Sequence, residues 1–540
     1  MKVQVGARKI EVRETAIDKV IGWFDPVRAQ RRLKARVSLA LVGGYAGASR
    51  SKRSLSQWIT GNSDPDSVIL PDLAVLRERS RDLVRNAPLA TGAINTVVTN
   101  AVGQGLKLQA RIDRETLRLD DEPAEKWESK TEREWQIWSE SQECDIGRTM
   151  NFAAIQELAF RQTLENGDVF TIMPRLKRGD FPYLLKLQVI EADRVCNQAN
   201  KPNSETLSGG VEKDSYGAPV NYHILKQHPG NMYAQKLMEW NIVPAFGAKT
   251  GTRNVIHLFR PLRPGQSRGV PYLAPVIESL KQLDRYTEAE LMAAVISGMF
   301  TVFVETERGT ADFGQFMPTS ETGAQASDED YKLGNGAIIG LAPGEKVNTA
   351  NPGRPNQAFD PFVKAILQQI GTALEIPYEV LIQHFSSSYS ASRAALLEAW
   401  RFFRNRRAWL AQNFCQLVYE NWLAEAIALG RIQAPGFFSN YNIRKAYSGT
   451  IWIGDAPGQL DPSKEVSAAQ QRIDLGVSTL DEETVLLTGG DFERNYPRIL
   501  KERRLMQAAG MWTPVTSGAA KPGNASQPDP LNTPNEGDNP

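Results

Sequence analysis

The stretch Leu76–Leu108 reads LRERSRDLVRNAPLATGAINTVVTNAVGQGLKL and contains two helical patterns with a break between them. In the first pattern, Arg77, Arg81 and Arg85 recur every fourth residue, so they share one face of a helix beside a face of leucines. The break falls at Pro88, because proline cannot continue a helix but is favoured at the first position of the next one. The stretch therefore predicts that one helix ends here and another begins.

The second pattern has an apolar stripe and a marked end. The stripe recurs at helical spacing and consists of Ala90, Ile94, Val97 and Ala101. Gly103 and Gly105 follow, and glycine commonly ends a helix because it adopts left-handed backbone angles without strain. The segment 106–110 then reads as extended chain. As local structure, the whole stretch predicts a well-capped helical hairpin.

The same arrangement, written LRxRxRDLxRNxPxAxxAI and then VGxG, resembles the N-terminal third of the lambda-type portal proteins of tailed bacteriophages. Further motifs of this family are matched over roughly residues 20 to 510. These motifs are Glu165–Asp168, Ile190–Val195, His257–Pro261, Arg263–Pro271, Tyr389–Arg393 and Asp461–Glu465. The resemblance implies an α+β, predominantly helical fold of several domains that assembles as a ring.

Portal proteins are divided into wing, stem, clip and crown, and the resemblance assigns these parts to the chain. The expected parts are a basic N-terminal arm at 1–70, the wing α+β body at 71–271, the first stem helix at 272–300, the clip at 301–356, the second stem helix at 357–383, the tunnel loop at 384–392, the long wing helix at 393–430, the crown at 431–510 and a disordered tail at 511–540. The tail is assigned from composition, because its six prolines with Gly, Ser and Asn leave too little apolar surface to bury.

The resemblance also implies a function. A portal ring, dodecameric in this family, lies at one capsid vertex and passes double-stranded DNA in during packaging and out during ejection, without sequence preference. The implied partners are further copies of the chain, the terminase large subunit, the major capsid protein and the head-completion or adaptor proteins. The implied location is the virion, with the host cytoplasm during assembly.

Two groups of site residues follow from the resemblance. The tunnel loop that contacts DNA comprises His384, Ser386, Ser387, Ser388, Ser390, Ser392 and Arg393. The stem or channel charges are Lys281, Asp284, Arg285 and Glu288, which alternate in sign at helical spacing. Hydroxyl groups hold phosphates lightly and without base specificity. The alternative is a plain connection between helices, in which Ser390 or Ser392 caps the following helix.

Helical patterns cover 272–298 and 392–429, and the second is the longest in the chain. Arg401, Arg404 and Arg406 on the second pattern are interpreted as solvated or paired between subunits, with contact to DNA as the alternative. Trp135 and Trp138 are spaced for core packing and not for base stacking. Strands are expected at 169–173, 183–190, 255–259, 301–305 and 337–341.

The overall composition is compatible with such a protein. The chain has 63 basic and 62 acidic residues, a net charge of +1, whereas a protein that grips DNA tightly is usually basic. Near neutrality is compatible with a conduit through which a duplex slides, and equally with an ordinary globular surface. No apolar run is long enough for a membrane span, so no membrane partner is expected. The three cysteines are distant in sequence, which favours reduced, buried thiols.

Motifs for catalysis are missing from the sequence. The segment 340–346 has glycines and a lysine, but neither the spacing nor the hydroxyl residue of a phosphate-binding loop. The four histidines form no metal-ligand pattern with each other or with cysteine. We therefore expect no metal site, no cofactor and no enzymatic activity. The alternative function, a nucleic-acid-processing enzyme of a phage, requires an acidic metal cluster or a phosphate loop.

Overall fold

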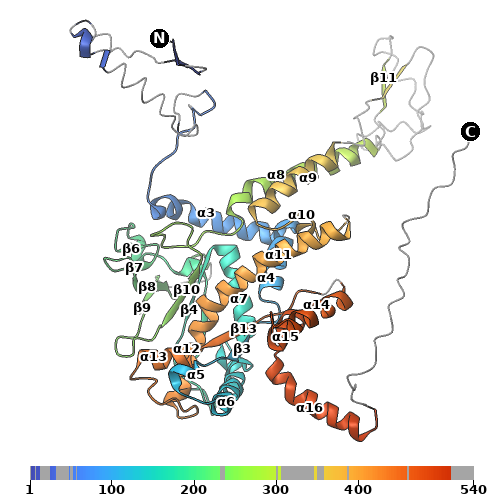
Figure 1. Cartoon of the computed structure of the whole chain (residues 1–540). Helices are drawn as coiled ribbons and strands as arrows, with labels where there is room; N and C mark the ends of the chain where they lie inside the picture. The colour runs from blue at the N-terminus through green and yellow to red at the C-terminus, as the bar shows by residue number, and fades with distance from the viewer. Residues whose placement is uncertain are drawn as a thin grey trace, which may run out of the picture. The chain divides into compact units, whose positions relative to one another are not determined.

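The computed structural model describes residues 57–231, 238–298, 302–305, 346–349, 358–385, 388–458 and 461–511, together with short pieces before residue 57. The chain divides into two compact units, Met1–Asp64 and Pro65–Pro540. In the first unit, β1 (Lys2–Val5) and β2 (Arg8–Glu11) form an antiparallel hairpin. The second unit is mostly helical with several small sheets (Figure 1), which confirms the predicted α+β class.

The opening stretch forms the predicted hairpin of two helices, α3 (Pro65–Asn86) and α4 (Pro88–Ala101). Pro88 occupies the first turn of α4, as expected. Gly105 follows α4 with a φ of 96°, where only glycine is unstrained. A side chain at this position would also lie 2.9 Å from the Cα atom of Ala153, so both the turn and the close approach require glycine.

The main hydrophobic core lies where α4, α6 (Asp121–Ser139) and α7 (Phe152–Asn166) meet the long helix of the C-terminal half. Trp135 and Trp138 are buried in it, with 4% and 0% of their surface exposed. The rings that pack around Trp135 belong to Trp138, Phe152, Tyr419, Trp422 and Trp452. The two tryptophans are therefore core residues, as predicted.

The central sheet of the body has three strands, with β4 (Asp168–Ile172) between β10 (Val255–Phe259) and β5 (Gln188–Ile190). Both pairs are antiparallel. The strands predicted at 169–173 and 255–259 are confirmed. The strand predicted at 183–190 is wrong in length, because only its last three residues form a regular ladder with β4.

Two further sheets complete the body. The first contains, in this order, β6 (Leu207–Ser208), β7 (Val211–Lys213), β8 (Pro219–Leu225) and β9 (Trp240–Pro244). The second pairs β3 (Lys107–Ala110) with β13 (Thr450–Ile453). Short helical turns link these parts at η2 (Gln142–Cys144), η3 (Ala192–Arg194), η4 (Gln198–Asn200), α5 (Arg114–Leu117) and α13 (Tyr441–Tyr447). The β3–β13 pair joins the start of the body to a segment that follows α13.

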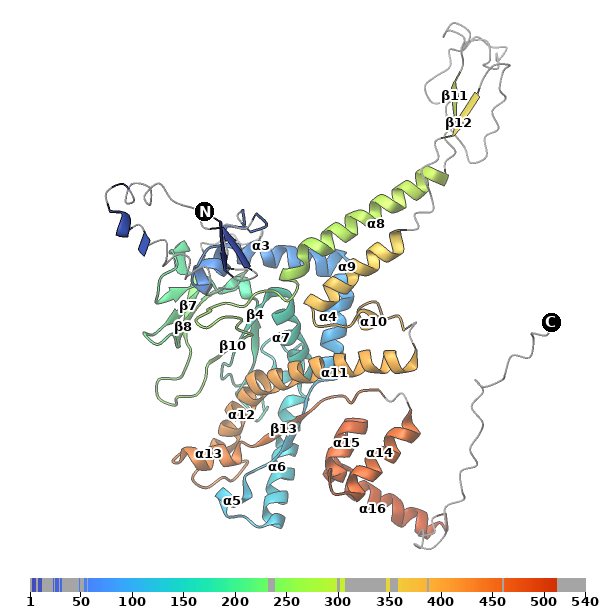
Figure 2. The same ribbon diagram turned by 45° about the horizontal axis from the view of Figure 1, so that its top comes forward.

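A pair of helices, α8 (Ile277–Gly298) and α9 (Phe359–Ala373), extends from the body as an arm (Figures 1 and 2). The predicted helix over 272–298 begins later than expected, because the short 3-10 turn η5 (Ala274–Val276) precedes α8. Tyr286 of α8 packs its ring against Phe359 and Phe362 of α9.

Beyond the far end of α8, β11 (Val302–Glu305) pairs with β12 (Lys346–Thr349). The strand predicted at 301–305 is confirmed. The partner strand is β12, whereas the segment predicted at 337–341 lies outside the described residues.

The longest helix of the described chain runs from Tyr389 to Ala428 in three joined parts. These are α11 (Tyr389–Leu410), a π-helical turn η7 (Ala411–Cys415) and α12 (Gln416–Ala428). A π turn inserts one residue into the helix, which shifts the facing side chains without ending the helix. Gly430 then ends it with a φ of 74°, as its sequence position predicts.

The last described helices are α14 (Pro462–Asp474), α15 (Leu480–Thr488) and α16 (Phe492–Ala508). The side chain of Asp461 caps α14 through the backbone N–H of Lys464. Thr479 and Glu482 form the predicted capping box at the start of α15. Among the described helices, none combines the length and the apolar composition that a membrane span requires.

Candidate functional site

The residues expected in the tunnel loop do not all lie in a loop. His384 follows the short helix α10 (Tyr378–Leu381) and is exposed, and Ser386 and Ser387 lie outside the described residues. Ser388 is the N-cap residue of α11 and makes no side-chain cap hydrogen bond. Ser390, Ser392 and Arg393 lie in the first turns of α11, since this helix begins at Tyr389. Ser390 and Ser392 are therefore not the cap residues that the alternative expects, whereas a plain connection between the helices stays an open alternative.

The four charged residues expected on the first stem helix lie on α8, as predicted. Lys281 and Asp284 form an exposed ion pair with an N–O distance of 3.2 Å. Arg285 and Glu288 are exposed as well. An exposed pair of this kind contributes little to stability, on the order of 0.5 kcal/mol. These side chains are therefore available to a neighbouring molecule.

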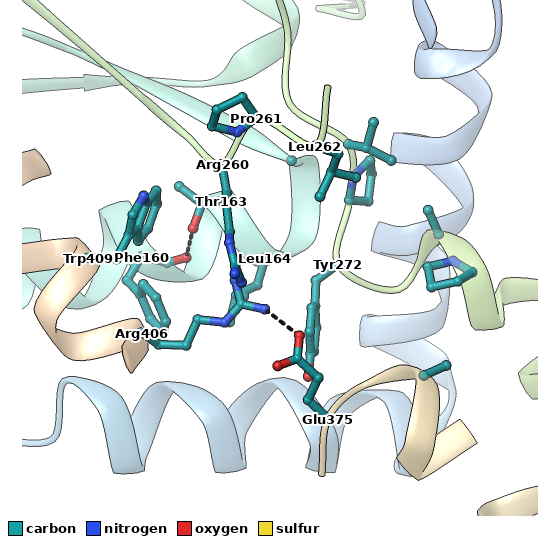
Figure 3. Close-up of a pocket in the computed structure, with 16 residues that line it drawn as sticks. Phe160, Thr163, Leu164, Arg260, Pro261, Leu262, Tyr272, Glu375, Arg406 and Trp409 are labelled. Atoms are coloured by element: carbon teal, nitrogen blue, oxygen red, sulfur yellow. Dashed lines mark hydrogen bonds and ion pairs between the residues drawn. The ribbon is translucent and has the colours of Figure 1, made fainter. Parts of the chain in front are cut away.

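A pocket of about 390 Å³ lies where the arm meets the body (Figure 3). The guanidinium group of Arg406 lies over the rings of Tyr272 and Phe402, at 5.5 and 4.8 Å from their centres. One of its nitrogen atoms is 3.7 Å from a carboxylate oxygen of Glu375. Burial lowers the pKa of Arg406, and the nearby charge of Arg260 lowers it further.

This pocket corrects the interpretation of Arg406 as a solvated or subunit-bridging residue. Its side chain is only 11% exposed and packs within its own subunit. Arg401, by contrast, is 73% exposed and Arg404 is exposed too, so both stay available as expected. Glu375 has a φ of 55°, an unusual conformation for a residue other than glycine, at the corner between α9 and α10.

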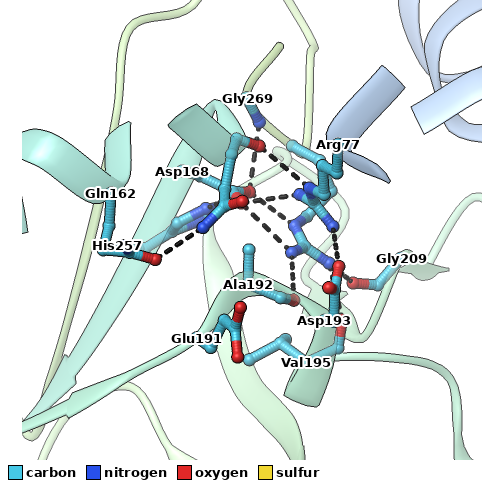
Figure 4. A network of polar contacts seen from close by, with 12 residues as sticks. Arg77, Gln162, Asp168, Glu191, Ala192, Asp193, Val195, Gly209, His257 and Gly269 are labelled. Carbon is cyan, nitrogen blue, oxygen red and sulfur yellow. Dashed lines mark hydrogen bonds and ion pairs between the residues drawn. The ribbon is translucent and has the colours of Figure 1, made fainter. Parts of the chain in front are cut away.

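A buried network of charges surrounds Asp168 at the start of β4 (Figure 4). Asp168 is fully buried and accepts hydrogen bonds from the guanidinium groups of Arg77 at 2.7 Å and Arg268 at 2.6 Å. The backbone N–H of Gly269 donates to the same carboxylate at 3.1 Å. The Nε2 atom of His257 lies 3.2 Å from it. Every carboxylate oxygen therefore has more than one partner.

Electrostatics fixes the charge states in this network. Burial alone would raise the pKa of Asp168, but the charges of Arg268 and Arg77 outweigh it and hold this pKa well below its ordinary range. Burial lowers the pKa of Arg77 to about 10, so this residue stays protonated at neutral pH. Burial also lowers the pKa of His257, so its ring is neutral and Nε2 donates to Asp168.

The network ties distant segments of the chain together. Arg268 also donates to the backbone carbonyls of Ala192, Val195 and Gly209. Arg77 donates to the carbonyl of Asn166 at 2.9 Å and pairs with Asp193 at 3.3 Å. Two arginines and two aspartates thus balance each other within one buried cluster. Removing one partner from a buried group of this kind costs about 3–5 kcal/mol.

The sequence predicted that Arg77, Arg81 and Arg85 share one helix face but did not predict that Arg77 is buried, with only 4% of its surface exposed. A signal for the network was nevertheless present. Asp168, Asp193, His257 and Arg268 each belong to a separate motif that resembles the portal family, and Arg77 belongs to the opening stretch. The motifs are scattered along the sequence but meet at this one cluster, which positions α3 and the central sheet.

One group of three described side chains has the geometry of a possible metal site. Ligand atoms of Glu191, Asp193 and His228 lie within 4.8 Å of one another. The guanidinium group of Arg81, however, is 3.3 Å from Glu191 and 2.5 Å from Asp193, so it already supplies the positive charge. The three residues need no metal to balance their charges, and we assign none.

The cysteines are free. Cys144 and Cys415 are buried, which agrees with the prediction, whereas Cys196 is only half-buried. Burial raises the pKa of the Cys144 thiol to about 12 and that of Cys415 well above its ordinary value. These two thiols are therefore protonated and unreactive at neutral pH.

The helical arm, the long helix and the motif cluster together fit a portal protein. The family described as phage portal protein, lambda family, matches residues 51–407, about two thirds of the chain. The chain therefore belongs to the lambda family of phage portal proteins. Members of this family are structural proteins of the phage head-tail connector, and they are not enzymes.

Individual relatives cover most of the chain. It is 27% identical over 505 residues to portal protein B of Escherichia phage lambda, which covers 89% of this chain and 92% of that protein. It is 25% identical over 498 residues to the portal protein of Escherichia phage N15, with 88% and 92% covered. Among solved structures, the chain is similar to a chain in the virion of the native gene transfer agent (GTA) particle. The match covers 77% of this chain and 94% of that chain, at 13% identity and a TM-score of 0.41.

Proposed function

We propose that this protein forms a closed ring of twelve subunits at one vertex of the capsid, and that double-stranded DNA passes through the ring during packaging and ejection. The match to the lambda portal family over residues 51–407 carries this proposal. A closed ring repeats one head-to-tail contact around its axis, so each subunit offers two different surfaces. The proposed ring also docks the terminase large subunit, the major capsid protein and the head-completion or adaptor proteins. It assembles in the host cytoplasm before it joins the virion.

The arrangement of helices and strands supports an assignment of the portal parts to segments of each subunit. We assign the stem to 272–300 and 357–383, because α8 and α9 project from the body as a packed pair. The clip is the segment 301–356 beyond that pair. The remaining assignments are the N-terminal arm at 1–70, the wing at 71–271 with its long helix at 393–430, the crown at 431–510 and the tail at 511–540. The exposed charges at Lys281, Asp284, Arg285 and Glu288 then face the channel or the next subunit.

We further propose that the connection from His384 to Arg393 contacts the moving duplex. Before Arg393 this segment contains hydroxyl groups but no lysine or arginine, so it steadies DNA without trapping it. Removal of Ser386–Ser388 tests this role. We expect intact rings with impaired packaging or leaking genomes. Normal packaging, or rings that fail to form, would show that the segment only connects two helices.

The ring itself is tested by averaging electron micrographs of the purified full chain. Twelve copies of a 59.9 kDa chain give a particle of about 720 kDa, which sedimentation measures independently. We expect a closed ring with an axial opening wide enough for a duplex. A stable monomer or a twofold dimer under all salt conditions would contradict the proposal.

A further inference from the structure

The helix α16 carries a row of basic side chains along one side. Arg494, Arg498, Lys501 and Arg504 follow each other at intervals of four, three and three residues. At about 100° per residue, they fall within an arc of roughly 120° on the helix surface. The two glutamates of this helix, Glu493 and Glu502, lie just outside this arc. The row is therefore a continuous strip of positive charge, which we call the α16 basic strip.

The side chains of the basic strip have no ion-pair partner among the residues that the structure describes, and all four are exposed. Glu493, at the edge of the strip, is held 3.2 Å from Arg111. α16 buries no side chain completely. Positive charge without a compensating carboxylate favours an external anion as its partner.

The apolar side of α16 points the other way. Phe492, Ile499 and Leu500 lie on the opposite side of the helix and are half-buried, where α16 contacts α15. Arg111 anchors the start of α16 to the body through Asp481 and Glu493. The second half of α16 runs away from α14 and α15 (Figures 1 and 2). The helix is thus held at its beginning and presents its basic side to solvent.

We infer that the α16 basic strip binds the sugar–phosphate backbone of double-stranded DNA. The strip is about 15 Å long, and duplex DNA carries one negative charge per about 1.7 Å of its axis. Tyr496 lies among the apolar residues and not within the strip, so the strip lacks the aromatic platform that single-stranded bases use. This inference rests on the proposed function, because a ring repeats the strip in every subunit around the path of the DNA.

Another segment of the same chain is an alternative occupant. The tail 512–540 contains Asp529, Glu536 and Asp538 but only one basic residue, Lys521. Duplex DNA is favoured over the tail on charge density, because the tail has only three carboxylate side chains spread over ten residues.

The test is a titration of the full chain into fluorescent duplexes of two unrelated sequences. Binding is read by fluorescence anisotropy at salt concentrations from about 50 to about 300 mM, a range that includes physiological ionic strength. The strip variant is R494Q/R498Q/K501Q/R504Q. The matched control is R79Q/R85Q/K130Q/R133Q, which removes four exposed basic side chains from α3 and α6. We expect the strip variant to weaken binding about tenfold or more at low salt and to flatten its salt dependence, equally for both sequences. The control is expected to stay within about twofold of the unmodified chain.

Several results would overturn the inference. These are equal affinity of the strip variant and the unmodified chain, no binding by the unmodified chain at low salt, and tighter binding of a single strand than of the duplex. A chain that ends at Met511 and binds DNA more than about tenfold better, with the gain lost in the strip variant, would assign the strip to the tail. Sedimentation of each sample separates these outcomes from a failure of the ring, because binding by α16 is measurable on a chain of any oligomeric state.

Discussion

At the scale of single residues, most of the chemistry of this chain lies in buried charges. Asp168 shows how they are tolerated: its carboxylate is removed from water but receives two guanidinium groups, one backbone N–H and one imidazole. The tight packing around it leaves no room for side chains at the neighbouring glycines, since a Cβ atom on Gly269 would overlap the carbonyl oxygen of Gly167. The cluster therefore has a structural role: it holds α3 and the central sheet together.

Replacement of Asp168 by Asn is expected to destabilise the fold by about 3–5 kcal/mol, because Arg77 and Arg268 then stay buried with too little negative charge. Asp193→Asn, at a 20% exposed side chain, should cost clearly less. Chemical denaturation of both variants measures the difference. Because the pKa of folded Asp168 is lowered, its stabilising effect is complete above pH ~4, the unfolded value, and is lost as the pH falls toward the folded one. An Asp168→Asn variant as stable as the unmodified chain would contradict the role of the network.

Glu132 gives the opposite pH dependence. Burial is the main cause that raises its pKa to about 7; nearby Asp491 and Glu493 act in the same direction, and the hydrogen bond from the backbone N–H of Ala110 opposes them. The folded pKa lies above the unfolded value of about 4.3, so stability falls as the pH rises between these values. Glu132→Gln keeps the acceptor without the charge. We expect its melting temperature relative to the unmodified chain to rise from pH 5 to pH 8.

The exposed Glu122 on the same helix is a suitable control, because Glu122→Gln should show no such trend. If the Glu132→Gln difference is the same at both pH values, the carboxyl group of Glu132 is not the source of the effect.

At the scale of secondary-structure elements, α4 and the long helix hold each other through one arginine. Arg407 of α11 donates to the carbonyls of Asn100 and Ala101, which end α4, and to that of Asp455 after β13. The last carbonyls of a helix lack partners within the helix and carry partial negative charge, so a guanidinium group there satisfies both needs. A side chain at Gly454 would lie 2.7 Å from this guanidinium group. Gly103 and Gly105 end α4 through local backbone conformation, and the long-range contact with Arg407 gives its last carbonyl groups a partner.

Arg407→Ala is expected to destabilise the protein by about 3 kcal/mol, since three carbonyls lose a charged donor. Arg407→Lys should recover only part of this loss, because an ammonium group cannot reproduce the planar fork. Gly454→Ala should destabilise as well, because it displaces the guanidinium group. Thermal unfolding of the three variants, with the exposed Arg401→Ala as the control, measures these effects. A loss no larger for Arg407→Ala than for Arg401→Ala would refute this role.

At the scale of the whole molecule, the proposed ring multiplies every exposed feature of the subunit. In the proposed ring, the α16 basic strip is repeated in every subunit, although the net charge of the whole chain is only +1. The arm of α8 and α9 leaves Leu291, Met292 and Val295 exposed, which is costly in an isolated subunit and favours their burial between subunits.

A purified ring without terminase is expected to hydrolyse no ATP, because the chain belongs to a structural family and its sequence contains no phosphate-binding loop. Release of inorganic phosphate, measured with and without duplex DNA, checks this expectation. Activity that co-purifies with the ring and disappears with a single substitution in this chain would show that the energy for packaging does not come only from a partner.

The amino-acid sequence alone determined several helices and some of their ends, because caps, prolines, glycines and apolar periodicity act within a few residues. The α3–α4 hairpin, the capping box at Thr479 and the long helix after residue 389 all follow from such signals. The family motifs also pointed to a portal protein, which the match over 51–407 confirms. What only the tertiary structure decided is which charged residues are buried. The sequence places Arg77 on a helix face with two other arginines, and only the fold brings Asp168, 91 residues later, beside it. Arg406 was interpreted as solvated or paired between subunits, but Tyr272 and Phe402 enclose it. Burial depends on partners that are distant in sequence, and no local pattern contains that information.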